Sequence, residues 1–249
     1  MIQEPFATGN SLIHRMDPRY RVVFAAIFSF VIALSNRFPV LWSALFLSIL
    51  LVFISRLSLR KVGKRLLTVF WFLLLIWVVL PFTFEGESLY RIGPVSLTRP
   101  GILLAARITL KSTAILLSFM ALIATMTIAT LGHALNHLKI PGKLVHLFLL
   151  TYRYIFVIEE EYRRLWIAAK IRGFRSGTNI HSYKTWAYLI GMLFVRASVR
   201  AERVHKAMLC RGFCGRFYSL DGFGVPKQKP LTIMLMAVVI AGLIFMEIY

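Results

Sequence analysis

Residues 66–84 of this chain read LLTVFWFLLLIWVVLPFTF, an apolar run without a charged side chain. As a helix it extends about 28 Å at 1.5 Å per residue, close to the ~30 Å thickness of a bilayer's hydrocarbon core. The ten residues before it carry five basic side chains and no acid: Arg56, Arg60, Lys61, Lys64 and Arg65. Because cytoplasmic loops collect Lys and Arg, the two segments together predict a transmembrane helix that starts at the cytoplasmic side.

Four more apolar segments complete the pattern, at residues 21–35, 40–55, 101–130 and 231–248. With 58% hydrophobic residues among 249, the chain is too apolar for an ordinary soluble domain. The predicted fold class is an all-α polytopic membrane protein with about five transmembrane helices, together with two long amphipathic cytoplasmic helices. Asp17 is expected to cap the first span, with Pro18 at its first position, and Pro39 to open the second. The neutral stretch 85–100 predicts a small extracytoplasmic hairpin.

Basic residues gather between the apolar segments. The net charge is +20, and residues 131–229 hold 17 of the 30 Lys and Arg. This distribution indicates topology and contact with headgroups or an acidic partner; nucleic acid is not expected, because the chain has no aromatic-basic recognition motif. We therefore expect an N-terminal transmembrane domain of four spans (1–130), a cytoplasmic domain (131–229) and a C-terminal transmembrane helix (230–249). The N-terminus is predicted to be cytoplasmic and the C-terminus extracytoplasmic, with no cleavable signal peptide.

The cytoplasmic region contains one short pattern twice. Residues 168–174 read AAKIRGF and residues 207–213 read AMLCRGF, and both fit Ala-x-x-x-Arg-Gly-Phe. The two arginines, Arg172 and Arg211, are 39 positions apart. Helices are predicted at 143–171 and 183–210, so each would end by presenting one guanidinium before a glycine. An alternative is a pair of basic helix stops that contact lipid phosphate, although this does not explain why the same frame occurs twice.

The sequence lacks the motifs of a self-driven machine. It has no Gly-x-x-x-x-Gly-Lys-Ser/Thr loop, so the protein itself is not expected to hydrolyse ATP, and it shows no hydrolase or metalloprotease signature. No catalytic residue and no cofactor is predicted. The one acid within a predicted span is Glu247, at its very end. A proton- or ion-coupled carrier usually needs such an acid inside the membrane, so the sequence favours a protein driven by an external motor.

Several other polar residues carry open interpretations. His133 and His137 have a spacing compatible with two metal ligands, but without a nearby carboxylate or thiol no metal site is predicted. Cys210 and Cys214 are expected to remain free thiols. The basic pair at 107 and 111 is interpreted as snorkelling to the membrane interface, the alternative being that it faces another helix or an aqueous groove.

Two equivalent arginines suit two equivalent pockets, such as those on a pair of homologous cytoplasmic ATPase subunits. Here the chain resembles a known family, the transmembrane T subunits of energy-coupling factor (ECF) transporters, in particular the CbiQ-type branch for cobalt or nickel uptake. The resemblance rests on residues 12–19, LIHRMDPR, and on the two Arg-Gly signatures. The family's usual form of the signature is Ala-Arg-Gly, whereas Ile171 and Cys210 precede the arginines here.

This resemblance implies a scaffold that transmits ATPase motion to a separate substrate-binding membrane subunit. It implies a partner-binding set at the two signatures: Ile171, Arg172, Gly173, Cys210, Arg211 and Gly212. The implied partners are two ATP-binding-cassette subunits, a CbiM-like substrate-binding (S) component and the lipid bilayer of a bacterial inner membrane. Uptake of Co²⁺, which supplies cobalamin biosynthesis, is the favoured role. The alternatives are Ni²⁺ or a vitamin as substrate, a stand-alone carrier or channel, and a membrane enzyme that uses the two histidines.

Overall fold

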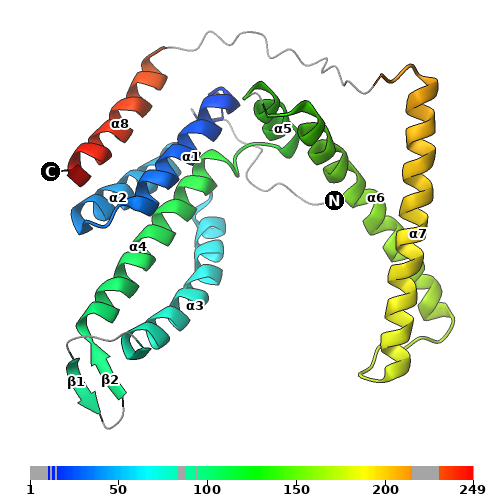
Figure 1. The fold of residues 1–249 in the computed structure, drawn as a ribbon, viewed down its shortest axis with the longest axis horizontal. Coiled ribbons are helices and arrows are strands. Elements are labelled where there is room, and N and C mark those ends of the chain that lie inside the picture. The colour runs from blue at the N-terminus through cyan, green and yellow to red at the C-terminus, as the bar shows by residue number, and fades with distance from the viewer. Residues whose placement is uncertain are drawn as a thin grey trace. The chain divides into compact units, whose positions relative to one another are not determined.

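The computed structural model describes residues 11, 13, 14, 16–83, 88–92, 95–138, 140–214 and 230–248, with the backbone alone for 88–97 and 230–233. Its elements, labelled in Figure 1, are α1 (Pro18–Leu34), α2 (Phe38–Ile54), α3 (Leu59–Thr83), β1 (Ser88–Ile92), β2 (Val95–Thr98), α4 (Arg99–Leu122), α5 (Ile128–His137), α6 (Gly142–Ile171), α7 (Ile180–Cys210) and α8 (Pro230–Ile248). Within this part of the chain the fold is helical apart from one hairpin.

The chain divides into two compact units, and one boundary falls inside α5, after Ala134. The first unit contains α1–α4, the hairpin and α8, and the second contains α6 and α7. Among the described residues, α3 and α4 are long and apolar enough to cross a membrane, while α2 and the part of α8 from Met234 are shorter apolar helices. The count of about five spans and the functional domain boundaries at 130 and 229 stay predictions.

The predicted start of the first helix is confirmed. The side chain of Asp17 accepts a hydrogen bond from the Arg19 backbone N–H at 3.0 Å, and Pro18 is the first helical residue. The carboxylate thereby satisfies one of the amide groups that a helix leaves without a partner at its N-terminus. Pro39 likewise lies in the first turn of α2, which begins at Phe38.

The basic segment before the third span is not a separate loop. Helix α3 begins at Leu59, so residues 60–65 form its first turns and continue directly into the apolar run. Arg and Lys are good helix formers, and Gly63 alone does not interrupt the helix. The break from α2 lies earlier, at Arg56, whose φ of 50° turns the chain.

The predicted segment 101–130 is divided in two. Helix α4 ends at Leu122, and α5 starts at Ile128. Threonine hydroxyls explain the break: Thr125 donates to the Ala121 carbonyl at 2.9 Å, and the hydroxyl of Thr127 accepts from the Thr130 backbone N–H at 3.1 Å, as an N-cap residue does. The apolar side chains between them gave no sign of this stop.

The hairpin predicted within 85–100 is confirmed as local structure. Strands β1 and β2 pair antiparallel, with Ile92 opposite Val95 and Arg91 opposite Ser96. The hairpin joins α3 to α4, and its placement outside the cell stays a prediction.

Helix α4 is the central element of the first unit, because it packs against α1, α2 and α3. Its contact face is built from small side chains, and Ala105, Ala114 and Ala121 are fully buried. A Cβ on Gly101 would lie 2.9 Å from the Leu80 carbonyl oxygen and from Pro81 Cα, so α3 and α4 approach closely there. Small residues that let backbones approach are typical of helix packing inside membranes.

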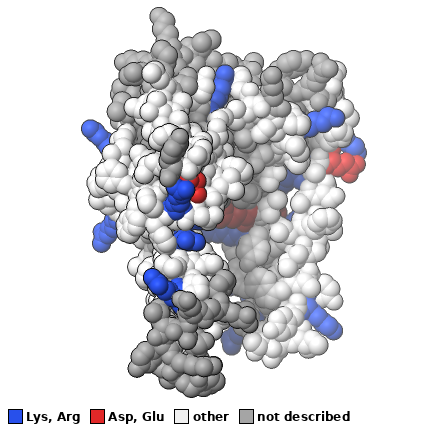
Figure 2. All heavy atoms as spheres, turned by 60° about the vertical axis from the view of Figure 1, so that its left-hand side comes forward, with Lys and Arg blue, Asp and Glu red and all other residues white. Residues whose placement is uncertain are grey.

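Large apolar side chains cover the outside of the same unit. Phe46, Trp71 and Phe72 are 66%, 68% and 67% exposed. On the face drawn in Figure 2, uncharged residues dominate and Lys and Arg occupy scattered points. A surface of this composition suits hydrocarbon, because exposing such rings to water is unfavourable.

The pair at 107 and 111 contacts neighbouring helices, which corrects the snorkelling interpretation. Lys111 Nζ donates to the Ala33 carbonyl at 2.8 Å and so caps the C-terminal end of α1. The guanidinium of Arg107 lies 5.1 Å from the centre of the Phe38 ring. Both side chains therefore tie α4 to the turn between α1 and α2.

Candidate functional site

Helices α6 and α7 form an antiparallel hairpin (Figure 1). At one end the rings of Trp166 and Trp186 stack with centroids 4.9 Å apart, and Phe174 meets both rings edge-on. Farther from the connecting loop, Glu161 of α6 contacts Arg196 and Arg200 of α7. Residue numbers that fall along α6 therefore pair with numbers that rise along α7.

The first Arg-Gly signature forms the C-terminal stop of α6. Arg172 is the cap residue, and Gly173 follows with φ of +81°. The Gly173 N–H donates to the Lys170 carbonyl at 3.0 Å, and the Phe174 N–H donates to the Ala169 carbonyl at 3.1 Å. This pair of hydrogen bonds defines a Schellman motif, which requires a left-handed residue and therefore favours glycine.

The second signature repeats this geometry at the end of α7. Arg211 is the cap residue, and Gly212 has φ of +79°. Its N–H donates to the Leu209 carbonyl at 3.0 Å, and the Phe213 N–H donates to the Met208 carbonyl at 3.1 Å. The predicted helix ends are thus confirmed at both signatures, and the shared Arg-Gly-Phe frame corresponds to one shared backbone motif.

Both signatures face outward. Arg172 and Arg211 are exposed, Ile171 is 81% exposed, and Cys210 is an exposed free thiol, as is Cys214. The structure does not bring the two signatures together. Since Trp166 is level with Trp186, Arg172 is level with the first turns of α7, whereas Arg211 lies at its far end. For a helix rising 1.5 Å per residue, that separation is roughly 40 Å.

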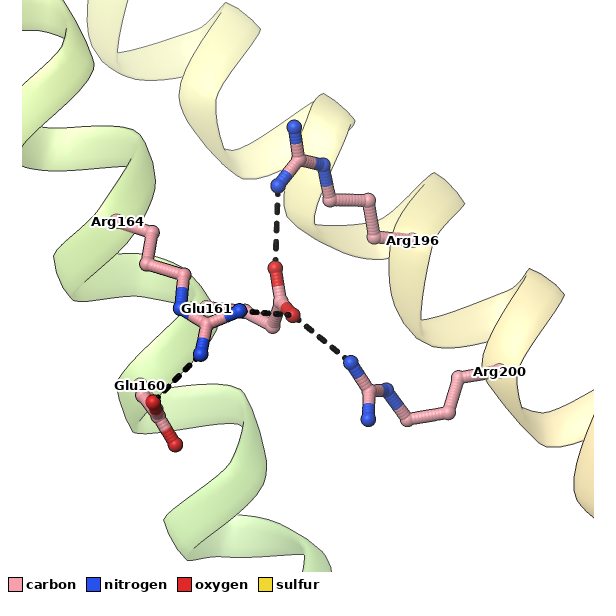
Figure 3. Close-up of polar contacts among 5 residues, drawn as sticks. All are labelled: Glu160, Glu161, Arg164, Arg196 and Arg200. Atoms are coloured by element: carbon pink, nitrogen blue, oxygen red, sulfur yellow. Dashed lines mark hydrogen bonds and ion pairs between the residues drawn. The ribbon is translucent and has the colours of Figure 1, made fainter.

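An ion-pair cluster joins the two helices between the signatures (Figure 3). Glu161 approaches Arg196 at 3.1 Å, Arg200 at 2.8 Å and Arg164 at 3.8 Å. Its side chain is 14% exposed, whereas the three arginines are 44–64% exposed. The hydrogen bond from Arg196, helped by the charges of the three guanidiniums, lowers the pKa of the Glu161 carboxyl from its ordinary value.

Sequence reasoning missed this cluster. It recognised the acidic run 159–161 and the cationic stripe on the second helix, but it did not pair them. One signal was available: Glu161 and Arg200 are separated by 39 positions, the same spacing as the two signatures.

An apolar groove lies beside the cluster, between the same two helices. It encloses about 570 Å³ and is lined, among others, by Leu147, Tyr154, Val204, His205 and Phe213. A smaller adjoining hollow brings Arg211 next to Arg153 and His146 of α6. The far signature is therefore surrounded by positive charge.

Metal-ligating groups are not gathered in this part of the molecule. Among the residues that the structure describes, no three or more His, Cys, Asp or Glu side chains are grouped to hold a metal ion. His133 and His137 lie on α5, the short helix that contains the division between the units.

Comparison with known proteins decides the family. A family model described as the cobalt transport protein CbiQ matches residues 9–220, most of the chain. The chain belongs to the CbiQ family. The resemblance inferred from the N-terminal segment and the Arg-Gly signatures is thereby confirmed, and the CbiQ-family chain is a membrane subunit of a transporter rather than its catalytic subunit.

Relatives of this CbiQ-family chain carry a common name, energy-coupling factor transporter transmembrane protein. The protein from Brevibacillus brevis is 31% identical over 91% of this chain and 88% of its own length. The protein from Listeria innocua is 30% identical over 86% and 85%. The protein from Bacillus subtilis is 27% identical over 98% and 97%. The similarity thus extends over nearly whole chains.

Proposed function

We propose that this protein is the transmembrane coupling subunit of an ECF-type importer. It would transmit conformational change from two cytoplasmic ATP-binding-cassette subunits to a separate substrate-binding membrane subunit. The observation that supports this role best is the pair of identically built, exposed Arg-Gly ends on one rigid hairpin. The names of the relatives support the transporter class.

The geometry suits two motor subunits. Ends that lie roughly 40 Å apart cannot enter one pocket, but they match one pocket on each of two neighbouring subunits. Each guanidinium would form paired hydrogen bonds with a carboxylate in a groove between ATPase lobes. Because α6 and α7 contain 30 and 31 residues, closure of the motor would move them as levers.

For the substrate we propose Co²⁺, with Ni²⁺ or a vitamin as alternatives. The description of the family model names cobalt, whereas the relatives' names give no substrate. The substrate would bind a CbiM-like S component, so the coupling subunit itself needs no ligand cluster. The proposed site is a bacterial inner membrane, with the N-terminus and α6–α7 cytoplasmic and the C-terminus outside.

The test compares arginine variants in the assembled importer. In Arg172→Ala and Arg211→Ala the ATPase affinity should fall at least about tenfold, because truncating one partner of a buried charge pair costs roughly 2–5 kcal/mol. The double variant should lose ATP-driven uptake of radiolabelled Co²⁺ while remaining folded in the membrane. Arg175→Ala and Arg203→Ala are matched controls, since both are exposed arginines outside the signatures.

Three results would overturn the proposal in different ways. Full uptake by the double variant removes the coupling role of the two arginines. Transport by the purified chain alone, without ATP, establishes a stand-alone carrier or channel. Uptake of Ni²⁺ or a vitamin in place of Co²⁺, or co-purification of a vitamin-binding membrane subunit, keeps the coupling role and corrects the substrate.

A further inference from the structure

The internal repeat of the sequence corresponds to a structural repeat. Adding 39 to a residue number in α6 gives its equivalent in α7, so that Arg172 corresponds to Arg211 and Glu161 to Arg200. The structure brings the second of these pairs into contact, at 2.8 Å. Equivalent residues of an antiparallel pair meet only near a two-fold axis, as in an isologous interface. The hairpin is therefore related to itself by an approximate two-fold axis close to Glu161.

Contacts away from the axis agree with this relation. The aromatic contacts of Trp186 with Trp166 and Phe174 have as their equivalents Leu147 with His205 and Phe213. These last three residues line one groove between the same helices. The two ends of the hairpin are thus built alike, with large rings filling one end and smaller side chains leaving the other open.

We propose that Glu161, bridged to Arg196 and Arg200, is the pivot that positions the two Arg-Gly ends. This inference rests on the proposed coupling function. Arg172 lies 11 residues beyond Glu161 on α6, and Arg211 lies 11 residues beyond Arg200 on α7. The bridge holds the two ends at equal distances from one point, as a two-fold motor requires.

The chemistry of the bridge suits a register-fixing contact. Side chains that line the surrounding groove are mostly apolar, and apolar contacts slide at little cost because they have no preferred direction. A carboxylate that accepts from two guanidiniums one turn apart fixes both the sliding position and the rotation of the facing helix. Charged groups that specify register between helices have this role in coiled coils.

The structural test measures the distance between the two ends in the full-length protein in lipid nanodiscs. Spin labels at the native Cys210 and at Ile171→Cys occupy equivalent positions of the repeat, with Cys214→Ser removing the second thiol. The parent should give one narrow distribution centred at roughly 40 Å, from the helical rise. Glu161→Gln should broaden it, because the neutral amide cannot hold both guanidiniums.

Matched variants separate the bridge from general effects of charge. Glu160→Gln changes the adjacent acid, which pairs with Arg164 on its own helix, and should leave the distribution narrow. Glu161→Arg should broaden it further, and the exchanged pair Glu161→Arg with Arg200→Glu should restore it. If Glu161→Gln does not fold, the exchanged pair decides: a narrow distribution supports the pivot and a broad one overturns it.

The functional test uses the assembled importer. Glu161→Gln should retain ATPase binding but reduce uptake per ATP hydrolysed by about fivefold or more, the lower range of coupling effects. A distribution and an uptake ratio equal to those of Glu160→Gln would overturn the pivot. Failure of the proposed function looks different, because the arginine variants at 172 and 211 would then have no effect while the distance measurement still responds to Glu161.

Discussion

Replacing Gly173 by alanine tests whether the signature glycine is needed for its backbone conformation. At φ of +81° an L-residue is strained, and a Cβ at this position would have nothing within 4 Å. The cost is therefore conformational rather than steric, about 1–2 kcal/mol for a left-handed residue. Gly212, with φ of +79° and equally open space, should respond by the same amount.

Amide hydrogen exchange measures this cost directly. The Phe174 N–H is protected by its bond to the Ala169 carbonyl, which exists only while residue 173 stays left-handed. A loss of about 1–2 kcal/mol should accelerate its exchange roughly 5- to 30-fold. Unchanged exchange in Gly173→Ala would refute the claim that the glycine maintains the helix stop.

Two control substitutions give opposite expectations. Gly173→Asn should restore most of the protection, because asparagine tolerates the left-handed region. Gly191→Ala, inside α7 and also in open space, should stabilise its helix by about 1 kcal/mol. If Gly191→Ala destabilised the hairpin to the same extent, alanine itself would be the cause and not the left-handed backbone.

Three further predictions concern other parts of the chain. Gly101→Ala should lower stability by about 1–3 kcal/mol in thermal denaturation of the purified protein, because its Cβ would meet the Pro81 backbone at 2.9 Å. Arg21→Ala should cost about 1–3 kcal/mol in the same assay, because the buried Arg21 side chain donates to the Leu122 carbonyl at 2.7 Å. Because its lowered folded-state pKa keeps Glu161 ionised, the α6–α7 contact should persist as pH falls through the usual glutamate pKa of about 4.3 and be lost only below it. A change in label distances near pH 6 would contradict this.

Controls for the stability assays lie on α3. Gly63→Ala adds a methyl group where nothing lies within 4 Å, so it should not destabilise the protein. Arg60→Ala removes an exposed guanidinium and should change stability by less than about 0.5 kcal/mol. A comparable loss in either control would mean that the assay does not report the specific contacts of Gly101 and Arg21.

Features with a local cause were predictable from the sequence. The Asp17 cap, the hairpin within 85–100 and the helix ends before Gly173 and Gly212 each depend on a few neighbouring residues. The break between α4 and α5 was missed, because the apolar pattern continues through it while threonine hydroxyls end the helix. The early start of α3 was missed because a run of basic residues indicates membrane topology but not the absence of a helix.

The candidate site divides along the same line. The sequence located both arginines, and each helix end follows from its own heptapeptide. The Glu161 bridge depends on which faces of α6 and α7 meet, and that is decided by packing of the whole hairpin. Lys111 shows the same limit, since its bond to the Ala33 carbonyl joins residues 78 positions apart. Neither partner carries a local sign of the other.

The equal spacing of the signatures from Glu161 has a mechanical consequence. Eleven residues of helix make an arm of roughly 16 Å on each side of the bridge. A rotation of about 10° around that point would carry each guanidinium some 3 Å, in opposite directions, which is about the length of one hydrogen bond. A balanced beam of this kind turns without translating, so a small, symmetric closing stroke is converted into torque with neither side doing more work than the other.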